Sequence, residues 1–338
     1  MADYKTIHGT KVRSYTTDPD NPITGQVWYD KTNNVLQFQA AGAGAWASGG
    51  ALGTARFSMG GAGASNSSAL GFGGDSPPTP GYANTEKYNG TAWTEVADLN
   101  TARGNAARGS GGTQTSALYF GGRPNPAKTE TESWNGTCWS EVADLNTGRS
   151  NLGSATEDNT SALAFGGLGT PPNAAKYDVT ESWNGTSWTE LSGDLNTARN
   201  AHTGFGIKTS AVACGGEASP GYVAFTESWN GSAWTEVADA NFQRSGGGSA
   251  GTSNTSGLIF GGFDHSPTDL RTAKTELWNG TSWSEQADLS GTTYHTQAGG
   301  GTSASAISFG GEGPSNQQRT ATEEWSNPTL TIKTVNTD

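Results

Sequence analysis

Acidic side chains recur at two fixed places in this sequence, and paired carboxylates are the first chemistry to consider. Glutamates follow threonine at Glu86, Glu132, Glu181, Glu227, Glu276 and Glu323, and aspartates recur at Asp98, Asp144, Asp194, Asp239 and Asp288. A glycosidase needs one special pair, in which one carboxylate holds a proton and the other is ionised. A group that recurs at a regular interval along the chain is more simply explained by a structural role than by catalysis. We therefore predict that these carboxylates cap strand ends or bind neighbouring backbone, and that the protein is not an enzyme and has no catalytic residues.

Arginines recur with the same period, at Arg56, Arg103, Arg149, Arg199 and Arg244. The sixth copy has Thr293 in register instead. Two interpretations are open. The arginines pair with the repeated aspartates of adjacent repeat units, or they form a ring of positive charge near one mouth of a central channel. We favour the pairing.

Metal and cofactor chemistry is not indicated by the remaining candidate residues. His8, His202, His265 and His295 fall at unrelated repeat positions, and no two have metal-ligand spacing. Cys138 and Cys214 do not form a CxxC pair, and the glycine-rich stretches contain no phosphate-binding loop sequence. We predict no metal and no cofactor.

Composition favours short strands over helices and excludes several partners. The 338 residues are only 32% hydrophobic but include 50 Gly and 12 Trp, which suits tight turns and an aromatic core. With 19 basic against 31 acidic residues, the chain lacks the positive field that nucleic-acid binding requires. The N-terminal MADYKTIHGT is not apolar, and no run approaches the length of a membrane span. We expect no nucleic-acid partner and no membrane span.

An internal repeat organises the chain. An apolar strand ending in Gly-Gly recurs with its first glycine at Gly73, Gly121, Gly166, Gly215, Gly261 and Gly310. A tryptophan recurs at Trp46, Trp93, Trp139, Trp188, Trp234 and Trp283. Both markers count six, with spacings of 45 to 49 residues. Each unit has room for four strands.

The dipeptide Asn135-Gly136 and its equivalents predict a hairpin within each unit. A two-residue type I′ turn needs φ > 0 at both positions, which Asn and Gly tolerate best. Such a turn would place Trp134 and Trp139 diagonally on one face of the hairpin. The tryptophan pairs then replace the missing aliphatic core.

Side-chain size increases along each unit, from Gly and Ala, through Ala-Leu-Phe, to Trp. A wedge-shaped propeller blade demands this gradient, because it is crowded at the axis and broad at the rim. We predict an all-β, six-bladed propeller of four-stranded antiparallel blades over residues 41–338. The strand near Trp46 closes the last blade; the alternative is that TLTIKTV near the C-terminus closes it.

The chain resembles two known groups. The Gly-Gly strand, the aromatic residue and the tryptophan at this period resemble the kelch repeat, which implies a β-propeller. Residues 1–40, which do not fit the repeat, read as a short β-hairpin extension. Their DPDNPITGQVWYDKTNNVLQF, followed by AWASGG and LGTAR, is similar to N-termini of virion and tail-fibre-like proteins of tailed, particularly marine, bacteriophages. This resemblance implies a virion appendage that meets the host surface, assembles as a homo-oligomer and contacts other virion or tail proteins through the N-terminal segment; alternatively, the segment is a hairpin that covers an edge of the propeller.

The loops between the second and third strands are irregular and contain proline. Meander geometry places all of them on one face of a propeller, and function in repeat scaffolds concentrates on such loops. Their candidate ligand-binding residues are Tyr82, Arg123, Tyr177, Tyr222, Phe263, Asp264 and His265. The loops either recognise a host glycan or protein or pack against neighbouring subunits. We predict a non-enzymatic phage structural and receptor-binding protein located in the virion; the alternatives are a carbohydrate-active enzyme and a cellular kelch-type scaffold.

Overall fold

The computed structural model describes residues 12–19, 26–41, 44–78, 81–107, 112–170, 174–265, 270–291, 300–313, 317–327 and 330–335. The chain divides into two compact units. The smaller comprises residues 1–44 and 327–338, and the larger comprises residues 45–326. All regular elements in the described part are β-strands.

The smaller unit joins segments from both ends of the chain in one sheet. Its strands lie side by side in the order β1 (Arg13–Tyr15), β2 (Val27–Asp30), β3 (Val35–Ala41) and β30 (Leu330–Thr334). The expected hairpin is β2 with β3, while β1 runs parallel to β2. The expected propeller boundary at residue 338 differs from the structure, because β30 pairs with β3 and carries residues 327–338 into this unit.

Among the described residues, the larger unit contains six sheets of three or four strands that include the repeat, which we number in chain order, and one small extra sheet. Sheet 1 contains β5 (Gly60–Ser65), β6 (Ser68–Phe72), β7 (Thr85–Tyr88) and β8 (Trp93–Val96). Sheet 2 contains β9 (Ala117–Phe120), β10 (Thr131–Trp134) and β11 (Trp139–Val142). Sheet 3 contains β12 (Gly153–Asp158), β13 (Ser161–Leu168), β14 (Lys176–Trp183) and β15 (Trp188–Glu190).

The other three sheets repeat this order. Sheet 4 contains β16 (Thr203–Ile207), β17 (Ser210–Cys214), β18 (Thr226–Trp229) and β19 (Trp234–Val237). Sheet 5 contains β21 (Gly248–Ser253), β22 (Ser256–Phe260), β25 (Thr275–Trp278) and β26 (Trp283–Glu285). Sheet 6 contains β27 (Gly301–Thr302), β28 (Ser305–Phe309), β29 (Thr322–Ser326) and β4 (Ala45–Ser48).

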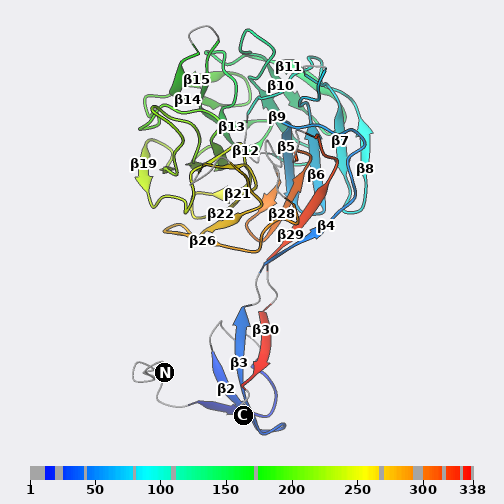
Figure 1. Cartoon of the computed structure of the whole chain (residues 1–338), viewed down its shortest axis with the longest axis vertical. Coiled ribbons are helices and arrows are strands. Elements are labelled where there is room, and N and C mark those ends of the chain that lie inside the picture. The colour runs from blue at the N-terminus through cyan, green and yellow to red at the C-terminus, as the bar shows by residue number, and fades with distance from the viewer. Residues whose placement is uncertain are drawn as a thin grey trace. The chain divides into compact units, whose positions relative to one another are not determined.

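These sheets are arranged around a common centre. Figure 1 shows β5, β9, β12, β21 and β28 towards the middle of the ring, with β8, β11, β15, β19 and β26 towards its rim. The last sheet takes its outer strand from the start of the larger unit in the sequence. β4 pairs with β29 and places Trp46 opposite Trp325. β4 therefore supplies the outer strand of sheet 6.

Buried apolar side chains gather between neighbouring sheets. One cluster joins Leu118 and Phe120 of sheet 2 to Ala162, Ala164 and Trp183 of sheet 3. Most inner strands consist largely of small residues, and β5 reads GGAGAS, whereas β16 reads TGFGI and contains Phe205. Small residues at the axis and tryptophans further out let wedge-shaped sheets pack at native density.

A chain of indole hydrogen bonds passes from sheet to sheet around the ring. The tryptophan on each outer strand donates its Nε1–H to a threonine hydroxyl on the third strand of the preceding sheet. The pairs are Trp93 with Thr322, Trp139 with Thr85, Trp188 with Thr131, Trp234 with Thr180, Trp283 with Thr226, and Trp46 with Thr275, at 2.9–3.1 Å. Each interface thus combines aromatic burial with one polar contact that fixes its register.

The Asn-Gly turn differs from the two-residue hairpin expected. Trp134 pairs directly with Trp139, so the connection has four residues, Asn135 to Cys138. Gly136 has φ +94°, but Asn135 does not lie in the left-handed region that a type I′ turn requires at both positions. Instead, the Asn135 carboxamide oxygen accepts hydrogen bonds from the backbone N–H groups of Thr137 and Cys138, at 2.9 and 3.0 Å.

The Gly-Gly doublets turn the chain out of the second strand. Gly121 and Gly122 have φ +69° and +109°, which side chains other than glycine rarely tolerate. A Cβ on Gly121 would also lie 2.5 Å from the carbonyl oxygen of Arg149. In five of the six sheets the doublet directly follows the second strand and starts the strand 2-to-3 loop, whereas in sheet 3 it lies inside β13, at an irregularity in the pairing of β13 with β14.

Candidate functional site

Five buried arginines bind the repeated glutamates. Each lies in the connection that enters a sheet and pairs with the glutamate on that sheet's third strand. The pairs are Arg56–Glu86 (2.6 Å), Arg103–Glu132 (2.7 Å), Arg149–Glu181 (2.7 Å), Arg199–Glu227 (3.0 Å) and Arg244–Glu276 (3.3 Å). The expected pairing with aspartates across adjacent units is wrong. Thr293, at the sixth position, lies outside the described residues.

The glutamates also hold the connections in place. Glu181 accepts hydrogen bonds from both the backbone N–H and the side-chain amide of Asn146, each at 2.8 Å. Arg149 donates to the carbonyl oxygens of Gly166 and Val179 as well as to Glu181. Burial lowers the pKa of Arg149, and the charge of Glu181 opposes that shift. These ions are thus paired and hydrogen-bonded parts of the scaffold.

Four of the five repeated aspartates accept a hydrogen bond from the backbone of a third strand, and the fifth, Asp144, accepts one from the Thr129 hydroxyl at 3.1 Å. Asp194 accepts a hydrogen bond from the backbone N–H of Thr180 at 3.0 Å. Asp98, Asp239 and Asp288 accept the corresponding bonds from Thr85, Thr226 and Thr275. This is the structural use predicted for them.

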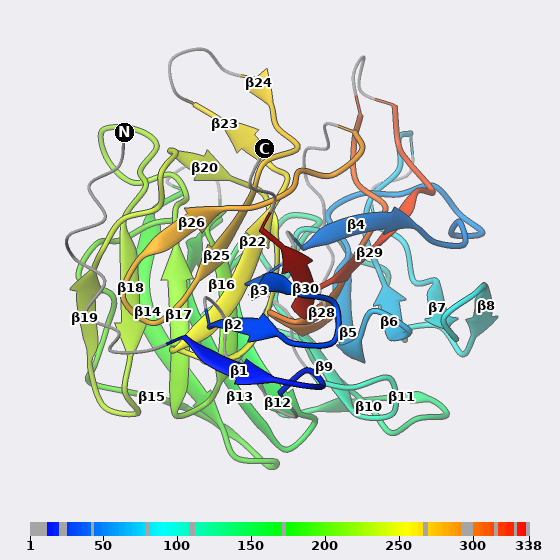
Figure 2. The ribbon, with the colours of Figure 1, turned by 90° about the horizontal axis from the view of Figure 1, so that it is seen from below.

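Functional side chains outside this scaffold gather at one end of the ring, which we call the loop face. It carries the strand 2-to-3 loops and the connections that enter each sheet. On this face β20 (Arg244–Ser245), β23 (Phe263–Asp264) and β24 (Leu270–Arg271) form a small extra sheet. Figure 2 shows these three strands beyond the ends of β22 and β25.

A recess of about 310 Å³ opens on the loop face between sheets 1 and 2. Its lining residues are Phe57, Asp75, Pro77, Pro78, Asn105, Arg123, Pro124 and Asn125. Only Arg123 among them was predicted from the sequence. The recess thus combines one carboxylate, one guanidinium and two carboxamides with aromatic and proline walls.

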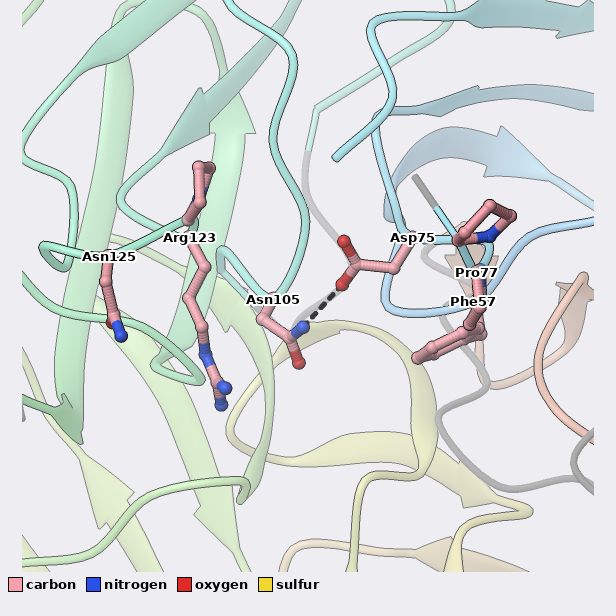
Figure 3. Close-up of a pocket in the computed structure, with 8 residues that line it drawn as sticks. Phe57, Asp75, Pro77, Asn105, Arg123 and Asn125 are labelled. Carbon is pink, nitrogen blue, oxygen red and sulfur yellow. Dashed lines mark hydrogen bonds between the residues drawn. The ribbon is translucent and has the colours of Figure 1, made fainter. Parts of the chain in front are cut away.

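Short backbone bridges fix the two charged residues of the recess. Asp75 and Phe57 exchange backbone hydrogen bonds at 2.7 and 3.0 Å, and Arg123 and Gly104 exchange them at 2.9 and 3.3 Å. The Asp75 carboxylate accepts from Asn105 Nδ2 at 2.6 Å and from the Gly81 N–H at 2.8 Å. Figure 3 shows Asn105 between Asp75 on one side and Arg123 on the other.

Four predicted residues meet in a second place on the loop face. The rings of Tyr222 and His265 stack, with centroids 3.3 Å apart and planes 4° from parallel, and Phe263 lies 5.0 Å from His265. His265 Nε2 lies 2.9 Å from Ser245 Oγ. Asp264 is buried and pairs with Lys274 at 2.9 Å. We call Tyr222, Phe263 and His265 the aromatic stack.

The last two candidates lie apart from these groups. Tyr82 is half-buried, and its backbone binds Gly74 and Arg103. Tyr177 is half-buried on β14, where its backbone carbonyl accepts from the Arg199 N–H. Neither lines the recess or joins the aromatic stack.

The opposite end of the ring has a different character. A channel mouth of about 330 Å³ there is lined by residues of all six inner segments, from Gly63 to Gly301. Glu157 is its one carboxylate, and most of the other lining residues are glycine and threonine. This mouth offers few convergent side chains for recognition.

The described residues hold no group of three or more His, Cys, Asp or Glu side chains able to bind a metal ion. Cys214 is a buried free thiol whose pKa is raised to about 12 by burial. Its thiol is therefore a core group rather than a nucleophile. No helix in the described part is long and apolar enough to cross a membrane.

The fold and the ring of sheets define an all-β, propeller-like protein. The solved structure of YjhT, which has a propeller-type fold, is similar, with a TM-score of 0.66 over 85% of this chain and 99% of that one. The two sequences are 14% identical, so the likeness concerns the fold alone. No protein-family model and no curated protein matches the chain, and the relation to kelch repeats rests on the sequence resemblance.

Proposed function

We propose that the protein is a non-enzymatic recognition protein that binds a glycan or protein on a cell surface through the loop face. The observation that carries this proposal is the separation of roles in the ring. The repeated charged groups are used by the scaffold, whereas the recess and the aromatic stack each occur once in the part of the chain that the structure describes, in loops that differ from sheet to sheet. Non-repeated polar and aromatic side chains on a rigid scaffold suit binding.

A glycosidase is supported less well by this arrangement. Such enzymes use two carboxylates, about 5–5.5 Å or about 6.5–9.5 Å apart, facing one bound sugar. Of the carboxylates that the structure describes, Asp75 alone lines the recess and Glu157 alone lines the opposite channel mouth. Binding without bond cleavage therefore fits the loop face better.

The smaller unit is the proposed attachment point to a larger particle. It contains the N-terminal segment that is similar to phage virion proteins, and it fastens that segment to the chain's C-terminal strand. In this proposal the particle is a phage virion, and the protein is one copy of a homo-oligomeric tail or surface appendage.

A glycan array with the full-length protein tests recognition. We expect binding without release of saccharide products, a weaker signal for Tyr222→Ala or Arg123→Ala, and an unchanged signal for Lys208→Ala. Lys208 is a matched control because it lies in the turn between β16 and β17, at the opposite end of the ring. Product release, or equal binding by all variants to every target, contradicts the proposal. Immunogold labelling of phage particles tests the virion location.

A further inference from the structure

The recess between sheets 1 and 2 has a shape that depends on one glycine. Gly104 occupies the position after the buried arginine, where other sheets have Phe57, Ser150, Asn200 and Ser245. A Cβ on Gly104 would lie 2.5–2.7 Å from all three carboxyl atoms of Asp75. Glycine at this position therefore lets the carboxylate of sheet 1 lie directly against the backbone of sheet 2.

The recess contains both a hydrogen-bond acceptor, the Asp75 carboxylate, and a hydrogen-bond donor, the Arg123 guanidinium. The Asp75 carboxylate is held by Asn105 and the Gly81 N–H, so its orientation is fixed before any ligand arrives. Arg123 is exposed and forms no ion pair with a described residue. A guanidinium only donates hydrogen bonds and an ionised carboxylate only accepts them.

We propose that this recess binds an uncharged pyranose residue of a glycan. Neighbouring hydroxyl groups both donate and accept, so a pair of them satisfies Asp75 and Arg123 together. The C–H face of the sugar ring then packs on Phe57 and the proline walls. This inference rests on the proposed recognition function and names the ligand class of one site on the loop face.

Charge and size distinguish this ligand from other candidates. Among the described residues, the charged groups that line the recess are one carboxylate and one guanidinium, so an anionic sugar would face Asp75 and a cationic ligand would face Arg123. A volume of about 310 Å³ lies at the low end of small-molecule sites, which suits one sugar residue better than an extended peptide. A free amino acid, with opposite charges at its two ends, is the competing ligand that the experiment must test.

Titration of the full-length protein by saturation-transfer NMR and calorimetry tests the assignment. The probes are the methyl glycopyranosides of glucose, galactose and mannose, with glucuronate and glycine as charged comparators. We expect at least one neutral glycoside to bind at millimolar concentration. Glycine or glucuronate binding in place of all three neutral glycosides overturns the assignment, as does the absence of neutral binding at tens of millimolar.

Two variants locate the binding. Gly104→Ala keeps every lining side chain but forces the Asp75 carboxylate to move, and its φ lies outside the left-handed region, so alanine brings no backbone strain. Arg123→Ala removes the donor. Each should weaken binding about tenfold or more, the usual effect of losing a charged hydrogen bond, while Lys208→Ala binds as the wild type does. Unchanged binding in both recess variants contradicts the assignment, and thermal unfolding curves verify that each variant is folded.

The array experiment separates this inference from the function on which it rests. If the array signal falls for Tyr222→Ala but not for Gly104→Ala, the loop face remains the recognition surface, but the recess is not the pyranose-binding site. If no loop-face variant changes the array signal, the proposed function itself is wrong.

Discussion

Each buried arginine of the ring depends on its glutamate for charge compensation. Arg149 and Glu181 both have side chains with no solvent exposure, and they meet at 2.7 Å. Removing either partner leaves the other as an uncompensated buried ion, which costs far more than losing an exposed pair. The recurrence of this pair explains how a sheet with few aliphatic residues is held to its entering connection.

At the residue scale we predict that Arg149→Ala lowers the free energy of unfolding by about 3–5 kcal/mol, because Glu181 stays buried without its cation. The double variant Arg149→Met with Glu181→Leu should recover most of the loss, since it removes both charges. Urea unfolding curves measure both values. A single variant as stable as the wild type would show that the pair contributes little to the ring.

Which carboxylate each arginine binds could not be predicted from sequence. Glu181 and Asp194 recur with the same period as Arg149, so spacing alone makes them equal candidates. The strand register decides, because it brings the third-strand glutamate to the entering connection and leaves the aspartate in the segment after the fourth strand. Asp75 and Asn105 were missed for a similar reason: the recess depends on backbone bridges between segments far apart in the chain.

At the element scale, the order and approximate limits of the strands followed from the repeat. The tryptophans lie at or near the start of the fourth strand in each sheet, and the Gly-Gly doublets mark the end of the second strand in all sheets but sheet 3, where β13 continues to Leu168. The turn between Trp134 and Trp139 was the exception. Asn and Gly favour a two-residue turn, but the Asn135 side chain binds two backbone N–H groups and stabilises a longer one.

The outer-strand tryptophans should dominate the energy of the interfaces between sheets. Trp139 is 5% exposed, packs edge-on against Phe72 of sheet 1 and donates to Thr85. We predict that Trp139→Ala lowers the free energy of unfolding by about 3–5 kcal/mol. Trp139→Phe should retain part of the packing but lose the hydrogen bond, which is worth about 1 kcal/mol.

Urea unfolding of these variants, with Ser140→Ala as the neighbouring exposed control, separates burial from local strand effects. A Trp139→Ala variant that unfolds at the wild-type midpoint would mean that the interface does not depend on the indole.

At the scale of the whole molecule, the repeat predicted a closed ring and the strand that closes it, because Trp46 is the end of a unit that lacks its beginning. It did not predict the partner of the C-terminal strand. TLTIKTV has strand-forming residues but no repeat marker, so its sequence fits any open sheet edge, and the structure pairs it with β3. Among the candidate site residues, Phe263 and His265 lie close together in the structure because they are two positions apart in the sequence.

Closure through β4 makes the ring depend on a short segment of four residues. In sheet 6, β4 pairs with β29, and Trp46 packs on Trp325 and against Phe260 of sheet 5. Without β4, the third strand of this sheet becomes an unpaired edge and the two aromatic side chains lose their cover, which favours opening and aggregation.

Two truncations that both lack residues 327–338 isolate this effect: one begins at residue 44 and keeps β4, and the other begins at residue 49 and lacks it. We predict that the first retains a single cooperative thermal transition and that the second melts at lower temperature or aggregates. Matching transitions by circular dichroism would show that the ring holds together without β4, and that the closing contact adds no stability.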